Sequence, residues 1–141
     1  LYPNQGEAGR VYVTASFGNG LKALPTDRQT PAWAGAAALI ASGIGPFDQN
    51  ALDRLTSARR ITMGFDIGPD AFVLRGQTRS ADLADQLRLM ATALEHPRWD
   101  RAPVERARAS FLTGYATLSA TPQGVLNREL GGLLRSGDKR W

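Results

Sequence analysis

His96 is the first residue to consider as a centre of chemistry, because it is the only histidine in a chain without cysteine. A zinc site takes three or four protein ligands, so several carboxylates would have to converge on His96. The adjacent Glu95 lies on another side of the expected helix. A serine–histidine–aspartate triad would also need His96, yet a histidine that ends a helix before Pro97 more often interacts with the helix carbonyls and dipole. We therefore assign no catalytic and no metal-binding residue to this chain.

A glycine-rich segment, residues 18–23, fits the G-x-G-x-x-A variant of the dinucleotide-binding motif and follows an expected strand. That motif binds pyrophosphate because a helix begins at the glycines and turns its free N–H groups toward the anion. Here Leu24, Pro25 and Thr26 interrupt the chain before a helix can begin. We interpret the segment as a turn and assign no cofactor-binding residue.

Four arginines lie on or near an expected strand hairpin: Arg59, Arg60, Arg75 and Arg79. A sheet that binds RNA presents aromatic side chains and arginines together on an open face. The aromatics of this hairpin, Phe65 and Phe72, belong instead to an alternating apolar set that we expect to be buried. The net charge of +4 is spread among acidic residues rather than gathered in one block. We therefore interpret the arginines as a solvated rim and expect no nucleic-acid partner.

The strands that position these residues follow from hydrophobic alternation. Residues 11–17 alternate apolar with small polar side chains, which predicts a half-buried strand. Residues 59–78 contain two further alternating runs separated by Gly68, Pro69 and Asp70, which predicts a hairpin.

Five helices are predicted from capping residues and apolar spacing. Their expected starts are Thr30-Pro31, Asp48, Ser80, Asp100 and Thr121-Pro122. The first is alanine-rich and is expected to end at Ser42-Gly43. In the third helix we expect a core stripe of Leu83, Leu87, Met90 and Leu94, and in the fourth an inner side of Val104, Ala107, Phe111, Tyr115 and Leu118. The order strand, two helices, two strands, three helices predicts an α+β fold, a mostly antiparallel sheet with helices packed on one face.

The length of 141 residues suits a single domain, residues 1–141. No apolar run approaches the roughly 18 residues that cross a bilayer, so we expect no membrane span. We expect the chain to be a piece excised from a longer multidomain protein.

Several segments, in this order, resemble the pitrilysin/insulinase family of zinc metalloproteases, and most closely the later, non-catalytic domains of bacterial periplasmic members. The resembling segments are the strand 11–17, residues 37–55, residues 65–109 and the closing residues 136–141. Family members typically contain a segment of the form DLxxaLxLLaxxlxxPxfdxxxferxra, which residues 82–109 match. The resemblance covers about four-fifths of the chain.

Catalytic domains of that family carry H-x-x-E-H on the first helix and a further glutamate on a later helix. The matching window here lies within residues 34–40. In either register its positions hold only alanine, leucine or isoleucine: Ala34, Ala37 and Ala38, or Ala36, Leu39 and Ile40. A later glutamate such as Glu105 or Glu129 would therefore find no other metal ligand with which to form a zinc site. The resemblance implies a metalloprotease-like half-domain with no catalytic, metal or cofactor residue, whose parent is a zinc metalloendopeptidase with zinc in its catalytic domain.

The resemblance further implies a supporting role, in which the domain completes the substrate chamber and packs against the zinc-bearing domain. The expected partners are other domains of the same parent and a peptide or unfolded protein substrate, and the expected location is the bacterial periplasm. One alternative is a pure protein-interaction module of an entirely inactive homologue, which an intact H-x-x-E-H elsewhere in the parent would exclude. The other is a stand-alone enzyme that uses His96, which predicts loss of activity in His96→Ala.

Overall fold

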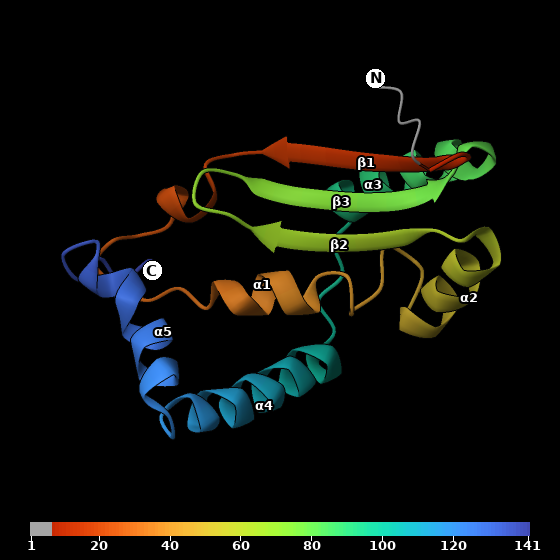
Figure 1. The fold of residues 1–141 in the computed structure, drawn as a ribbon. Coiled ribbons are helices and arrows are strands. Elements are labelled where there is room, and N and C mark those ends of the chain that lie inside the picture. Colours follow the sequence, from red (N-terminus) through yellow and green to blue (C-terminus); the bar gives the residue numbers. More distant parts are fainter. Residues whose placement is uncertain (1–6) are drawn as a thin grey trace.

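The computed structural model describes residues 7–141, which form a three-stranded antiparallel sheet and five α-helices (Figure 1). The strands are β1 (Arg10–Phe17), β2 (Thr62–Ile67) and β3 (Phe72–Arg79), in the order β1-β3-β2. The expected hairpin is therefore confirmed as β2 and β3, and β1 pairs with the other edge of β3. The α+β fold class with a mostly antiparallel sheet is also confirmed.

The two faces of the sheet differ because successive side chains alternate between them. On the inner face, Leu74 of the central strand is fully buried between its register partners Ala15 and Phe65. On the outer face, Arg75 lies between Thr14 and Gly64 and is exposed. The main core cluster lies on the inner side and consists of Ile44, Leu52, Ile61, Leu74, Leu89, Met90 and Ala93.

Three phenylalanines gather at the turn end of the inner face. Phe72 lies 5.8 Å from Phe17 and 6.3 Å from Phe65 between ring centroids. Such separations suit offset aromatic packing. Phe65 and Phe72, expected to be buried, are half-buried here.

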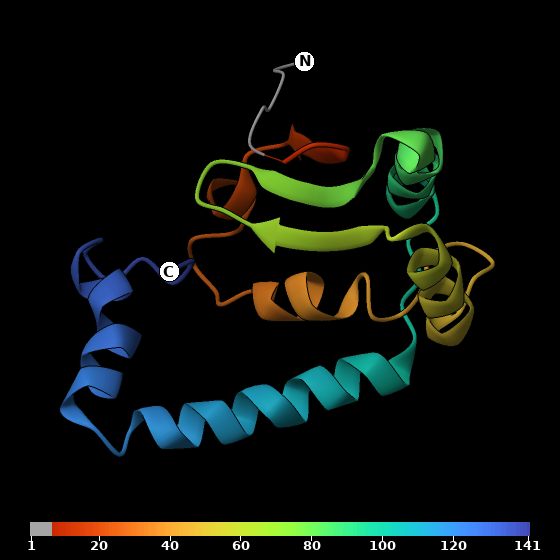
Figure 2. The ribbon, with the colours of Figure 1, turned by 45° about the vertical axis from the view of Figure 1, so that its right-hand side comes forward.

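The α-helices are α1 (Ala32–Ala38), α2 (Gln49–Arg59), α3 (Leu83–Glu95), α4 (Arg101–Leu118) and α5 (Pro122–Leu133). Helix α1 packs against β2, and α3 packs against β3. Helix α4 packs on α1, and α5 packs on α4, so these last two helices form an arm on the side of α1 away from the sheet (Figures 1 and 2).

Helix starts were predicted well at two positions and less well at the others. Asp48 caps α2 by accepting a 2.8 Å hydrogen bond from the Ala51 N–H, and Thr121 caps α5 in the same way. Asp100 precedes α4 but makes no capping hydrogen bond, and its carboxylate accepts from Arg98 instead. The prediction that Ser80 caps the third helix was wrong, because a 3-10 turn, Ser80–Asp82, comes first.

Helix α1 is shorter than the expected 31–42. It has seven residues, begins after Pro31 and continues as turns through residues 39–42. Thr30 supplies no side-chain cap; its main-chain oxygen accepts from the Ala32 N–H. The expected helix end at Ser42-Gly43 was therefore wrong, because α1 ends at Ala38. The turns after it end at Gly43, whose φ is 93° and where a Cβ would collide with the carbonyl oxygen of Phe47.

The buried face of α3 differs from the expected leucine stripe. Its buried residues are Gln86, Leu89, Met90 and Ala93, whereas Leu87 and Leu94 are 49% and 45% exposed. The physical reason is Gly76 of β3, which leaves space that the side chain of Gln86 fills. With its amide nitrogen turned toward the sheet, Gln86 donates to the main-chain oxygens of Gln77 and Thr62 at 3.3 and 3.2 Å.

Within residues 7–141, no helix combines the length and the apolar character needed to cross a membrane.

Candidate functional site

The window predicted to match the H-x-x-E-H motif, residues 34–40, spans most of α1 and the turn after it. Ala38 is fully buried and Leu39 almost so. A Cβ placed on Gly35 would lie 3.4 Å from Ile67 Cδ1, which reflects close packing of α1 on β2. Small side chains allow this approach, but they carry no atom that binds a metal or moves a proton. The residues of this window do not fit a zinc centre.

His96 ends α3 and is exposed. Its main-chain oxygen accepts a 3.1 Å hydrogen bond from the Gly45 N–H. It borders a shallow depression together with Glu95 and Asp100, and no residue of the window 34–40 lines that depression. Throughout residues 7–141, no three histidine, aspartate or glutamate residues come together in a way that could hold a metal ion.

Residues 18–23, the glycine-rich segment, form a turn that includes the short 3-10 helix Gly20–Ala23. The N–H groups of Leu21 and Lys22 donate to the main-chain oxygens of Gly68 and Pro69. These amides are therefore occupied by the β2–β3 turn rather than open to a phosphate group.

Three of the four arginines near the hairpin are in ion pairs. Arg59 contacts Asp85 of α3. Arg75 lies 3.4 Å from Asp66, and Arg79 lies 2.6 Å from Asp82. Such exposed pairs contribute little to stability, about 0–1 kcal/mol each.

The largest departure from expectation concerns α4. Val104 and Ala107 are half-buried, as expected for its inner side, but every residue from 108 to 123 is exposed. The apolar spacing was correct, whereas α1 covers only the first half of the helix. Together with α5 this leaves an extended apolar surface, which we call the α4–α5 surface: Phe111, Leu112, Tyr115, Leu118, Val125, Leu126, Leu130, Leu133 and Leu134.

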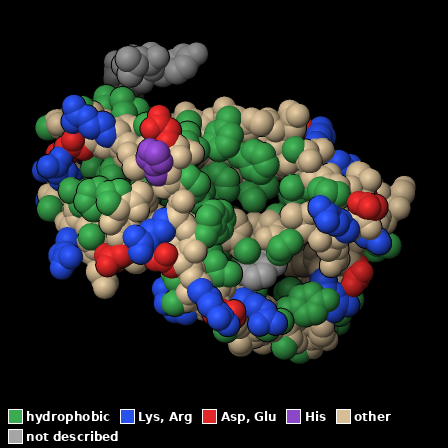
Figure 3. All heavy atoms as spheres, turned by 180° about the vertical axis from the view of Figure 1, so that it is seen from behind, with side chains coloured by type: hydrophobic (Ala, Val, Ile, Leu, Met, Phe, Trp, Pro, Cys, Tyr) green, Lys and Arg blue, Asp and Glu red, His purple; other side chains and the backbone are tan. Residues whose placement is uncertain are grey.

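The α4 part of the α4–α5 surface includes a hollow. A hollow of about 690 Å³ borders α4 and is lined by Phe111, Leu112, Tyr115 and Leu118, with Arg108 among its polar neighbours. Seen from behind, hydrophobic side chains lie beside blue and red charged side chains at the lower right of the molecule (Figure 3). Apolar side chains inside a charged rim are typical of protein interaction surfaces.

The corner between α4 and α5 is held by close packing and polar contacts. A Cβ on Gly124 would collide with the main-chain carbonyl of Leu118, so only glycine lets the two helices approach this closely. Arg128 of α5 donates to Ser119 Oγ at 2.7 Å and stacks over the Tyr115 ring at 5.5 Å. These contacts fix the position of α5 relative to α4 at their junction.

The C-terminal residues connect α5 back to the segment before α1. Arg140 Nη1 donates to the main-chain oxygen of Lys22 at 3.1 Å, and Lys139 Nζ donates to that of Asp27 at 3.2 Å. Arg140 also contacts Asp138 at 2.5 Å, and this hydrogen-bonded guanidinium lowers the pKa of the Asp138 carboxyl to about 2. Figures 1 and 2 both show the C-terminus beside the segment that leads into α1.

No protein-family model and no curated protein sequence matches the chain. Solved structures do match its fold, two proteases among them. The periplasmic protease PqqL from Escherichia coli matches with a TM-score of 0.76 over 92% of this chain and 14% of its own, at 16% sequence identity. The ferredoxin protease FusC, solved in complex with Arabidopsis ferredoxin, matches with a TM-score of 0.68 over 95% of this chain and 15% of its own, at 22% identity.

The chain has a pitrilysin/insulinase-type fold. It spans about one seventh of the length of the two proteases, so the likeness concerns a piece of each. The resemblance read from residues 82–109 and the neighbouring segments is thus confirmed at the level of the pitrilysin-type fold.

Sequence reasoning found the apolar residues of α4 but missed that they form a surface. Two signals pointed to it. The apolar stripe of α4 continues through Tyr115 and Leu118, so it is longer than the seven-residue helix α1 that packs on it. Leu126, Leu130 and Leu133 repeat the same spacing on a separate helix. A stripe longer than the helix that packs on it predicts that part of the stripe stays exposed.

Proposed function

We propose that this chain is a catalytically inactive, peptidase-like domain of a zinc metalloprotease, where it completes the substrate chamber and packs against the zinc-bearing domain. One observation carries the proposal: a pitrilysin-type fold whose first helix, α1, offers only alanine, glycine, leucine and isoleucine in the window 34–40. Activation of water by zinc needs metal ligands and a general base at those positions. The chemistry therefore belongs to another domain of the parent, which would hold the zinc ion.

The α4–α5 surface is the proposed contact with that domain. Its most exposed leucines are Leu112, Leu133 and Leu134. Burial of apolar surface stabilises a contact by about 25 cal/mol per Å². The fixed corner at Gly124 supports this role, because a preformed surface loses little conformational entropy on binding.

The substrate and the location follow from the two matched proteases. PqqL is described as a periplasmic protease, and FusC as a protease in complex with a ferredoxin. We propose by analogy that the parent of this chain cleaves peptides or unfolded proteins in the bacterial periplasm.

The proposal is tested by complementation. The zinc-bearing part of the parent is purified alone, and its hydrolysis of an unfolded peptide is measured before and after this chain is added. We expect hydrolysis to rise at least tenfold with the chain and to stop when a chelator is added. No rise, under conditions where the two parts bind each other, would contradict the chamber role. A parent without zinc-dependent hydrolysis in any combination would indicate the alternative, an interaction module of an inactive homologue.

A further inference from the structure

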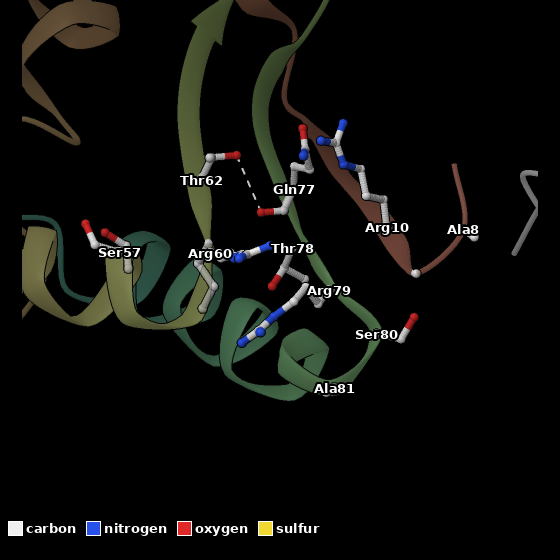
Figure 4. A pocket seen from close by; sticks show the side chains of 13 residues that line it. Ala8, Arg10, Ser57, Arg60, Thr62, Gln77, Thr78, Arg79, Ser80 and Ala81 are labelled. Atoms are coloured by element: carbon white, nitrogen blue, oxygen red, sulfur yellow. Dashed lines mark hydrogen bonds between the residues drawn. The ribbon is translucent and has the colours of Figure 1, made fainter. Parts of the chain in front are cut away.

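A second pocket lies at the end of the sheet where β1 begins and β3 ends. It encloses about 820 Å³ and is lined by no residue of α4 or α5, so it is separate from the α4–α5 surface. Three arginines line it: Arg10 of β1, Arg79 of β3 and Arg60, which follows α2 (Figure 4). Among its lining residues in the described part of the chain there is no aspartate or glutamate.

The register of the sheet pairs two of these arginines. Arg10 and Arg79 are direct cross-strand partners in the β1–β3 ladder, an arrangement in which like charges repel. Each has a carboxylate next to the pocket: Glu7 lies 3.5 Å from Arg10, and Asp82 lies 2.6 Å from Arg79. These two positive charges are thus compensated within the chain.

Arg60 differs from the other two arginines. Among residues 7–141, no carboxylate forms an ion pair with it. Its backbone has φ 49°, a left-handed conformation that is rare for a residue with a side chain, and its N–H donates to the carbonyls of Ser57 and Thr56. The end of α2 therefore fixes the point from which the uncompensated guanidinium reaches the pocket.

Hydroxyl groups complete the polar lining of this pocket. Ser57 and Ser80 are exposed residues in its wall and carry O–H donors. A guanidinium presents several N–H donors in a planar fork that matches a carboxylate in two-point contact. One uncompensated positive charge with nearby hydroxyls suits a monoanion better than a phosphate dianion.

We propose that this pocket binds a carboxylate group of a peptide, with Arg60 as the residue that contacts it. The choice of a peptide as carrier rests on the proposed function, since a domain of a peptidase chamber meets peptides. The pocket is also larger than a single carboxylate requires, which leaves room for the adjoining peptide residues. The carboxylate comes either from acidic side chains or from the peptide C-terminus.

Three labelled peptides distinguish these sources when their affinity for this chain is measured by fluorescence anisotropy. The first alternates alanine and glutamate and has an amidated C-terminus. The second has glutamine in place of glutamate, and the third is the glutamine peptide with a free C-terminus. At least tenfold tighter binding of the first than of the second identifies side-chain carboxylates. At least tenfold tighter binding of the third than of the second identifies the C-terminal carboxylate, and equal affinities for all three overturn the proposal.

Variants locate the binding on the protein. Arg60→Gln is expected to weaken binding of the preferred peptide at least tenfold. The matched control is Arg75→Gln, which removes the same charge from an exposed arginine of β3 outside the pocket and should change affinity less than twofold. Equal losses in the two variants would show non-specific charge attraction and overturn the proposal.

Folding of each variant is checked by far-UV circular dichroism. If Arg60→Gln does not fold, Arg60→Lys replaces it, because lysine keeps the positive charge but lacks the planar fork of donors. We expect Arg60→Lys to bind the preferred peptide at least threefold more weakly, and an unchanged affinity would refute the contact. The assay needs no partner domain. A failure here therefore stands apart from a failure of the complementation experiment.

Discussion

The role of the α4–α5 surface can be tested by replacing its three most exposed leucines with glutamine. Leu112, Leu133 and Leu134 have 58%, 72% and 72% of their surface exposed. Glutamine has nearly the helix propensity of leucine, so α4 and α5 should keep their structure. Because these side chains pack little within the chain, each change should alter the free energy of unfolding by less than about 0.5 kcal/mol.

The effect on association is expected to be much larger. Full burial of a leucine side chain stabilises by about 1.5–3 kcal/mol, and roughly two-thirds of each of these side chains remains to be buried by a partner. Each leucine therefore contributes about 1 kcal/mol or more to association, and all three contribute about 3 kcal/mol. A loss of that size raises the dissociation constant roughly a hundredfold.

The assay is titration calorimetry of the chain into the zinc-bearing part of its parent. The matched control replaces Leu87 and Leu94 on the outer side of α3, which are similarly exposed but lie outside the α4–α5 surface. The control should change the dissociation constant less than threefold. An unchanged constant for the folded triple variant, or an equal loss in the control, would refute the reasoning that places the contact on α4 and α5.

Three further predictions concern the fold. Gly76→Ala should lower the free energy of unfolding in urea by about 1–3 kcal/mol, because the new Cβ would lie 2.7 Å from Cδ of the buried Gln86. In a chain that also carries Gln86→Ala, the glycine change should cost less, and an equal cost in both backgrounds would contradict this contact. Leu74→Ala at the fully buried centre of the sheet should cost about 2–5 kcal/mol, and a cost below about 1 kcal/mol would contradict its position. Arg140 lowers the pKa of the Asp138 carboxyl from an ordinary value near 3.8 to about 2. The ionised Asp138 therefore stabilises the folded chain at a pH above the pKa that this carboxyl has in the unfolded chain, and this stabilisation is lost as the pH falls toward 2. The difference in melting temperature between Asp138→Asn and the unchanged chain should therefore be constant above about pH 5 and shrink between about pH 4 and pH 2; a constant difference throughout would refute the pairing.

Local sequence predicted those parts of the fold that depend on local interactions. Alternation in residues 59–78 predicted the β2–β3 hairpin, and the caps at Asp48 and Thr121 act within one helical turn. The face of α3 was predicted wrongly because it depends on a residue of another element. Gly76 makes space for Gln86, and nothing in the α3 sequence itself reveals that space.

The functional surfaces were harder to predict because their residues come from distant parts of the chain. Arg10, Arg60 and Arg79 meet in one pocket only through the β1–β3 register and the end of α2. The apolar stripe that contains Tyr115 was correctly identified, but the sequence alone did not reveal that α1 ends before it could cover the stripe. By contrast, the window 34–40 was chosen from the resemblance alone, and its match to the family's motif stays a prediction; α1 carries most of its residues.

The chain has a pitrilysin-type fold, and we propose that it performs no proteolysis itself. The most direct measurement is hydrolysis of an unfolded, fluorogenic peptide by the purified chain alone, with added zinc and then with a chelator. We expect no hydrolysis above the background rate under either condition. Hydrolysis that requires zinc, stops with the chelator and is carried by the chain itself would contradict this proposal.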